Sequence, residues 1–134
     1  MARVVRQADT DASGFAHFSS YVRMMEETEY AFLRSRGLCV VLYDERGTMG
    51  FPRLNVSIVV HEPLVFDDSV EVRLRMVEID GKQITYAFEL VQANQAIAVE
   101  GQFRVACCRF PGRDSPYAIL IPEFIEEALM GISK

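Results

Sequence analysis

The chain has 134 residues, half of them hydrophobic, and 14 Lys and Arg against 19 Asp and Glu give a formal net charge of −5 at pH 7. This composition is typical of a globular protein and excludes a disordered or collagen-like chain. The length suits a single domain, residues 1–134, with a real core, and the negative charge argues against a nucleic-acid partner.

Two further features concern where the protein works and what holds it together. No apolar stretch approaches the roughly 20 residues of a membrane span, and the start, MARVVRQADTD, lacks the apolar core of a signal peptide. We therefore expect a cytoplasmic protein. The three cysteines cannot form a closed disulfide set, and no zinc-like spacing is present, so we expect free buried thiols and no metal.

The predicted elements begin with a short strand at Arg3–Ala8, which ends in a polar loop. A long helix is predicted from about His17 to Arg36, because its apolar residues recur every three or four positions and so share one face. His17, Ser19 or Ser20 is expected to cap the start of this helix.

The middle of the chain changes to a period of two. Segments of alternating apolar and polar residues predict four strands with one buried face each: Leu54–Ile58, Val70–Met76, Ile84–Leu90 and Val99–Val105. The short connections Asp80–Lys82 and Ala93–Gln95 predict antiparallel hairpins. A final helix is predicted from about Pro122 to Met130.

These elements predict an α+β fold in which a curved antiparallel sheet wraps around one long helix, because only the sheet offers that helix an apolar surface to cover. The alternation is imperfect at Val59–Val60 and at Ala106–Cys108, where apolar side chains point to both faces. This suggests a second covered surface, which dimerisation would supply.

The segment Asp9–Gly14 places two carboxylates and a glycine in the loop that enters the long helix. A helix N-terminus presents unpaired N–H groups and partial positive charge, which can polarise a carbonyl group and hold an oxyanion. A carboxylate nearby can activate water or attack the carbonyl itself. On residue types alone, a purely structural role for Asp9 and Asp11 in the loop is the simpler interpretation.

Other catalytic patterns are absent from the sequence, which has no G-x-S-x-G, Walker or G-x-G-x-x-G motif. His17, Asp11 and a nearby serine have the residue types of a triad, but nothing in the sequence orders them as nucleophile, base and orienter. His61 precedes Glu62 at a strand end, where a turn or surface role is expected instead of a metal site.

Two motifs resemble hotdog-fold acyl-CoA thioesterases, in particular the group of 4-hydroxybenzoyl-CoA thioesterase. The segment Asp9–Gly14 and the helix after it are similar to the family's D-x-D-x-x-G motif and its long helix with an acidic residue. The segment Glu62–Asp68 is similar to the family's proline-containing strand connection. The resemblance covers nearly the whole chain and implies a hotdog fold, which dimerises edge to edge.

The resemblance also implies roles for single residues. Asp11 matches the family's catalytic aspartate, and Phe18 stands where the family uses a main-chain N–H at the helix start to grip the thioester carbonyl. The candidate substrate-binding residues are Gly14, His17, Tyr21, Met25 and Glu26. The candidate CoA-binding cations, which in this family often come from the neighbouring subunit, are Lys82, Arg104, Arg109 and Arg113. No cofactor is implied besides the CoA of the substrate.

The second half resembles the enediyne polyketide thioesterases, a hotdog branch that acts on carrier-bound polyketides, in Glu100–Cys107 and in Pro122–Leu129. That branch generally lacks the aspartate that this chain keeps at Asp11. The two resemblances together imply a homodimeric or homotetrameric acyl-CoA thioesterase with Asp11 as general base or nucleophile. The alternatives are an acyl-carrier-protein thioesterase, a dehydratase or isomerase using His17, a non-catalytic acyl-CoA-binding protein and a structural oligomer.

Overall fold

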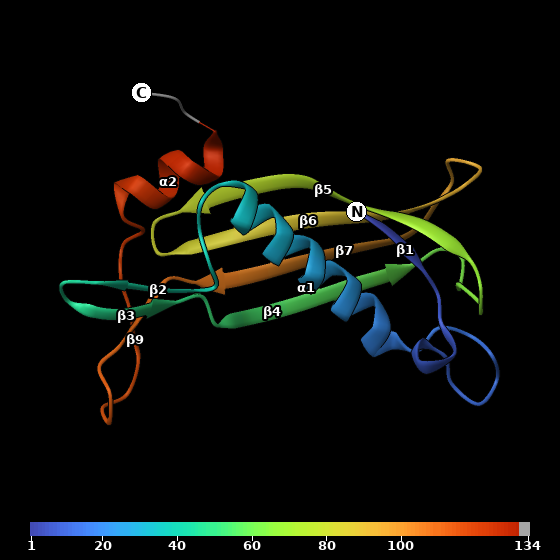
Figure 1. Ribbon diagram of the computed structural model, residues 1–134, viewed down its shortest axis with the longest axis horizontal. Helices are drawn as coiled ribbons and strands as arrows, with labels where there is room; N and C mark the ends of the chain where they lie inside the picture. The colour runs from blue at the N-terminus through green and yellow to red at the C-terminus, as the bar shows by residue number, and fades with distance from the viewer. Residues whose placement is uncertain (132–134) are drawn as a thin grey trace.

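The computed structural model describes residues 1–131, and its centre is one long helix, α1 (Phe18–Ser35), packed along a five-stranded antiparallel sheet (Figure 1). The strand order in this sheet is β1-β5-β6-β7-β4. Its strands are β1 (Ala2–Val4), β4 (Arg53–Val60), β5 (Ser69–Asp80), β6 (Gln83–Gln92) and β7 (Ile97–Ala106). The predicted α+β arrangement and the four long strands are confirmed.

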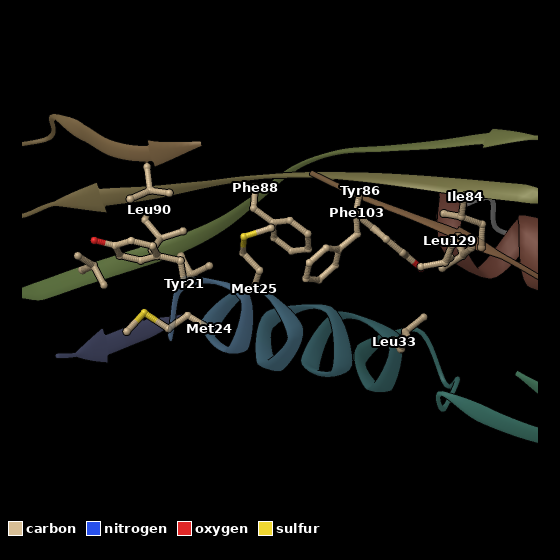
Figure 2. Packing of buried hydrophobic residues seen from close by; sticks show 14 of the residues in the cluster. Tyr21, Met24, Met25, Leu33, Ile84, Tyr86, Phe88, Leu90, Phe103 and Leu129 are labelled. Atoms are coloured by element: carbon tan, nitrogen blue, oxygen red, sulfur yellow. The ribbon is translucent and has the colours of Figure 1, made fainter. Parts of the chain in front are cut away.

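Helix α1 covers the sheet with the apolar face that the sequence predicted. Its buried side chains point toward the strands, where they meet aromatic residues of β6 and β7 (Figure 2). Met25 packs over Gly101 of β7, at which any Cβ would collide with the Met25 sulfur. This contact is one reason that a glycine is needed in the middle of a long strand.

A second, smaller sheet extends from the start of β4 and was not predicted. Its strand order is β2-β3-β8-β9, and its strands are β2 (Val41–Asp44), β3 (Gly47–Gly50), β8 (Cys108–Phe110) and β9 (Tyr117–Ala118). The terminal helix α2 (Glu123–Met130) follows it, with Pro122 at its N-cap and Gly131 in the left-handed conformation at its end. It begins one residue later than predicted and ends at the predicted residue.

The predicted strand Arg3–Ala8 is wrong beyond Val4. After β1 the chain forms a turn of 3₁₀ helix, η1 (Gln7–Asp9). The cause is local, since the Asp9 carboxylate accepts a hydrogen bond from the Arg6 N–H at 2.9 Å and folds the chain back. A side chain that bonds the main chain in this way competes with extended structure.

The second sheet also corrects the expectation for Ala106–Cys108. These residues are buried within the chain, where Ile119 donates a main-chain hydrogen bond to Cys107, so no second subunit is needed to cover them. By contrast, Val59 and Val60 remain 54% and 40% exposed on the free edge strand β4.

The cysteine prediction holds for two of the three thiols. Cys107 and Cys108 are free and buried, and burial raises the pKa of Cys107 to about 11. Cys39 is free but exposed, because it lies in the turn between α1 and the second sheet. Among residues 1–131, no helix is both long and apolar enough to cross a membrane.

Candidate active site

The loop Asp9–His17 is folded back on itself ahead of α1. The Asp11 N–H donates to the Phe15 carbonyl at 2.8 Å, and the His17 N–H donates to the Asp9 carbonyl at 2.6 Å. Gly14 closes the turn with a φ of +87°, a left-handed conformation that favours glycine. The two arms of this hairpin therefore hold Asp11 at the tip and deliver His17 to the helix start.

Asp9 anchors the loop. Its side chain is buried, its carboxylate accepts from the Arg6 N–H, and Arg23 lies 3.7 Å away. Its main-chain carbonyl also accepts a hydrogen bond from the Ser20 hydroxyl at 2.8 Å. These contacts tie the hairpin to the first turn of α1, so Asp9 has the structural role that residue types alone suggested.

Asp11 has a different environment, because its side chain is exposed. Its carboxylate accepts hydrogen bonds from the Ser13 hydroxyl and from the Ser13 N–H, the latter at 2.8 Å. These two bonds lower the pKa of Asp11 below its ordinary value. The carboxylate is therefore ionised at neutral pH, and water or a ligand can reach it.

The start of α1 leaves one main-chain donor open. His17 is the N-cap, and its Nδ1 accepts from the Ser19 N–H at 3.3 Å. The Ser20 N–H donates to the His17 carbonyl at 2.8 Å. No acceptor for the Phe18 N–H is found among residues 1–131, as expected for the first residue of a helix. The Phe18 side chain is 57% exposed.

The remaining candidate substrate residues lie further along α1. Tyr21 is buried, and its hydroxyl accepts a hydrogen bond from the Leu64 N–H at 3.1 Å. Met25 is in the core, and Glu26 is half-buried against Arg53 at 3.0 Å. Gly14 is in the same loop as Asp11, and its N–H donates to the Asp11 carbonyl at 3.1 Å, while His17 and Phe18 follow at the start of α1. Tyr21 and Met25 lie instead in the buried core under the helix.

The candidate CoA-binding cations lie at the other end of the sheet. Lys82 is in the β5–β6 turn, and Arg104, Arg109 and Arg113 lie at or beyond the end of β7, on the left of Figure 1, whereas α1 begins on the right. Helix α1 alone spans about 27 Å between these ends. Within one chain these cations are therefore remote from Asp11.

Arg109 is also engaged within the chain. Its guanidinium donates two hydrogen bonds to the Asp44 carboxylate, at 2.6 and 2.7 Å, and the residue is only 8% exposed. This pairing raises the pKa of Arg109 and lowers that of Asp44. A role for Arg109 toward a phosphate stays a prediction and requires this pair to open.

One buried ion cluster was missed by sequence reasoning. Glu29 of α1 is 2% exposed and pairs at 2.8 Å with Arg53, whose guanidinium lies 4.3 Å from the Phe103 ring centroid. Burial raises the pKa of Glu29, and Arg53 opposes that shift. The signal was present, because Glu29 stands between Met25 and Leu33 on the apolar face, where a charge requires a partner.

Five hollows on the surface of residues 1–131 are lined by residues other than Asp11 and Phe18. No cluster of potential metal ligands occurs among residues 1–131. The arrangement offers an ionised carboxylate and a free N–H at a helix N-terminus, which is chemistry suited to a carbonyl substrate.

Comparison with known proteins identifies the family. A sequence profile of the thioesterase-like superfamily matches residues 5–129. A putative esterase of Aquifex aeolicus (strain VF5) is 35% identical over 99 residues, which are 72% of this chain and 73% of that protein.

Solved structures show the same fold. A 1,4-dihydroxy-2-naphthoyl-CoA thioesterase from Synechocystis has a TM-score of 0.82 at 21% identity, covering 98% of this chain and 95% of that one. The dynemicin thioesterase has a TM-score of 0.79 at 20% identity, covering 98% and 94%. The expected hotdog fold is thereby confirmed, and the chain belongs to the thioesterase-like superfamily as a thioester hydrolase.

Proposed function

We propose that the protein hydrolyses acyl-CoA thioesters with Asp11 and the Phe18 N–H as its catalytic groups. The proposal is carried by two groups that lie within eight residues of each other, the exposed, ionised Asp11 carboxylate and the open main-chain donor of Phe18 at the start of α1. Family membership makes the thioester the natural carbonyl substrate for these groups.

The Phe18 N–H donates to the thioester carbonyl oxygen, and the positive end of α1 stabilises the negative charge that develops there. Asp11 either takes a proton from the attacking water or attacks the carbonyl carbon itself. In the second route a mixed anhydride forms while CoA leaves as the thiolate, and water then hydrolyses the anhydride. Both routes give the free acid and CoA.

A second copy of the chain completes the site in this proposal. Strand β4 is a free edge, and it exposes apolar side chains at Leu54, Val56, Val59 and Val60. Antiparallel pairing of two β4 strands about a two-fold axis brings the start of one beside the end of the other. The end of the partner's sheet that carries its cations then lies near the Asp9–His17 loop, which supports a homodimer with a shared cleft.

Aromatic acyl groups are the substrate class that we favour. Phe15 and Phe18 leave much of their rings exposed beside the candidate catalytic groups, at 45% and 57%. Stacking on such rings stabilises an aromatic acyl group. The Synechocystis enzyme, whose fold this chain shares, is described as acting on an aromatic acyl-CoA.

A carrier-protein thioester is the second candidate, because the dynemicin thioesterase shares the fold over 98% of this chain. A screen across aromatic, short-chain and long-chain acyl-CoAs, repeated with an acyl-carrier protein, decides between the two. We expect the fastest turnover with an aromatic acyl-CoA.

The decisive variant in that screen is Asp11→Asn, which keeps the size of the side chain and removes its charge. We expect the rate to fall about 10²- to 10⁴-fold. Glu78→Gln, which removes the same charge from an exposed position on β5, is the control and is expected to leave turnover unchanged. Unchanged turnover of every substrate by Asp11→Asn would refute the assignment.

A further inference from the structure

The loop that carries Asp11 belongs to a short three-stranded ribbon. Thr10 forms an antiparallel bridge with Ala16, and the Asp11 N–H donates to the Phe15 carbonyl at 2.8 Å. This register places Asp11 directly opposite Phe15. Residues that are directly opposite in an antiparallel pair project from the same face, so the side chains of Asp11 and Phe15 are neighbours.

The third segment of the ribbon comes from the connection between β4 and β5. Phe15 forms a second antiparallel bridge, with Val65, and the Ala16 N–H donates to the Leu64 carbonyl at 2.7 Å. Val65 therefore lies opposite Phe15, on the side away from Asp11. The side chains of Asp11, Phe15 and Val65 form one row across the ribbon, with neighbouring Cβ atoms about 4.5–5.5 Å apart.

The two faces of the ribbon differ in burial. Ala16 and Leu64, on the opposite face from this row, are 8% and 0% exposed and belong to the core. Phe15 and Val65 are 45% and 39% exposed, and Asp11 is exposed as well. Among residues 1–131, the segment of Asp11 pairs with no strand other than the one that holds Phe15. The apolar surface that continues the ribbon from Asp11 is therefore that of Phe15 and Val65.

The turn after Val65 fixes this residue in position. The Val65 N–H donates to the Asp68 carboxylate at 2.9 Å, and the Asp68 N–H donates to the Val65 carbonyl at 3.1 Å. Asp67, between them, has a φ of +74°, and its N–H donates to the Val5 carbonyl at 2.8 Å. A left-handed conformation is uncommon for a residue other than glycine and persists only where the surrounding contacts impose it. The position of Val65 is thus defined by the chain itself.

We propose that Val65 is a specificity-determining residue, which contacts the part of an acyl group that lies beyond Phe15. This inference rests on the proposed function, which puts the thioester carbonyl at Asp11. An acyl group that leaves the carbonyl along the row passes over Phe15 first and reaches Val65 next. A two-ring aromatic acyl group is long enough to contact both side chains, whereas an acetyl group ends before Val65. The site therefore favours extended aromatic acyl groups.

The kinetic test compares kcat/KM for 2-naphthoyl-CoA and for acetyl-CoA in the wild type and in Val65→Thr. Threonine keeps the branched shape and replaces a methyl group with a hydroxyl group. Loss of this one apolar contact is expected to lower the ratio of naphthoyl to acetyl turnover about fourfold. Val65→Ile keeps the contact and is expected to retain the ratio. An unchanged ratio in Val65→Thr would overturn the proposal.

The matched control is Val4→Thr, the same change at a similarly exposed valine. Val4 is 38% exposed, and it pairs with Ser69 next to the buried Val70, so it points to the face of the sheet away from α1. We expect its ratio to equal that of the wild type. An equal fall in Val4→Thr would show a general effect of surface polarity and would also overturn the proposal.

A ligand that cannot be hydrolysed separates this inference from the proposed function. In the ketone analogue of 2-naphthoyl-CoA, a methylene group lies between the carbonyl and the sulfur. Calorimetric titration is expected to show that Val65→Thr weakens binding of this analogue about fourfold, both alone and combined with Asp11→Asn.

The outcomes of the two measurements are distinct. If the wild type hydrolyses no acyl-CoA but Val65→Thr weakens binding of the ketone, the proposed function fails and the acyl contact of Val65 stands. If Asp11→Asn abolishes hydrolysis but Val65→Thr binds the ketone as tightly as the wild type, the role of Val65 is refuted and the proposed function stands.

Discussion

Asp11 and Glu29 are two carboxylates along the course of α1, and they have opposite environments. Asp11, in the loop before the first turn, is exposed, and its hydrogen bonds to Ser13 lower its pKa. Glu29, on the fourth turn of the helix, is almost fully buried, so its pKa is raised although Arg53 pairs with it. The comparison teaches that a charge on the buried face must be paired within the chain, whereas a charge at the helix entrance stays available to substrate.

The largest expected effect comes from removing the partner of the buried carboxylate. Arg53→Met leaves Glu29 buried without its cation and is expected to destabilise the fold by about 3 kcal/mol. Urea unfolding measures this change. Adding Glu29→Leu to the same chain should recover most of the lost stability, and failure to recover it would show that the unpaired Glu29 carboxylate is not the cause of the loss.

The pH dependence of stability separates the two carboxylates next. Because the folded-state pKa of Glu29 is raised above 4.5, the native state binds more protons than the unfolded state just above that pH. Stability is therefore expected to fall as pH rises from about 4.5 through the raised pKa and then to level off. Glu29→Gln should remove this decline, as measured by chemical unfolding at several pH values. A decline of equal size in the variant would assign it to another group.

The pKa of Asp11 is shifted in the opposite direction, and in the proposed mechanism this shift affects the rate. Because that mechanism needs the ionised carboxylate, the lowered pKa is expected to put the acid limb of kcat/KM at a lower pH than an ordinary aspartate would give. Ser13→Ala removes the hydroxyl group that contributes most to this shift, so the limb should move toward higher pH. Profiles of kcat/KM against pH for the wild type and the variant test this, and an unmoved limb would remove Ser13 from the account.

The smallest expected effect concerns the cap of α1. His17→Ala removes the acceptor of the Ser19 N–H and is expected to cost about 0.5–1 kcal/mol of stability. His17→Asn supplies a better capping group and should retain or increase the stability. Thermal unfolding of both variants measures the difference, and equal melting temperatures would mean that this weak bond contributes nothing.

The main sheet and α1 were predictable because their hydrophobic periods are long and unbroken. The second sheet was not, since β2 and β3 are four residues each and β9 is two, too short for an alternation to be recognised. The strand expected at Arg3–Ala8 failed for another reason, the side-chain bond from Asp9 to its own main chain.

The candidate site was predictable only in its local part. Asp11, Gly14 and Phe18 lie within eight residues, so a short motif is enough to bring them together. The contact between Glu29 and Arg53 joins distant parts of the chain, and their spacing carries no motif. In the proposed dimer, the positions of Lys82 and Arg113 relative to Asp11 follow from how the two chains pair, which one sequence does not encode in a local pattern.

Gly101 has a consequence for the geometry of catalysis. The Met25 thioether fills the space that a side chain would take at this point of β7, so this contact helps to fix the position of the helix on the sheet. A shift of α1 along its axis would move that thioether away from the space left open by Gly101. The contact therefore also helps to fix the axial position of the Phe18 N–H, which lies two turns earlier on the same helix and follows directly on the Asp9–His17 loop.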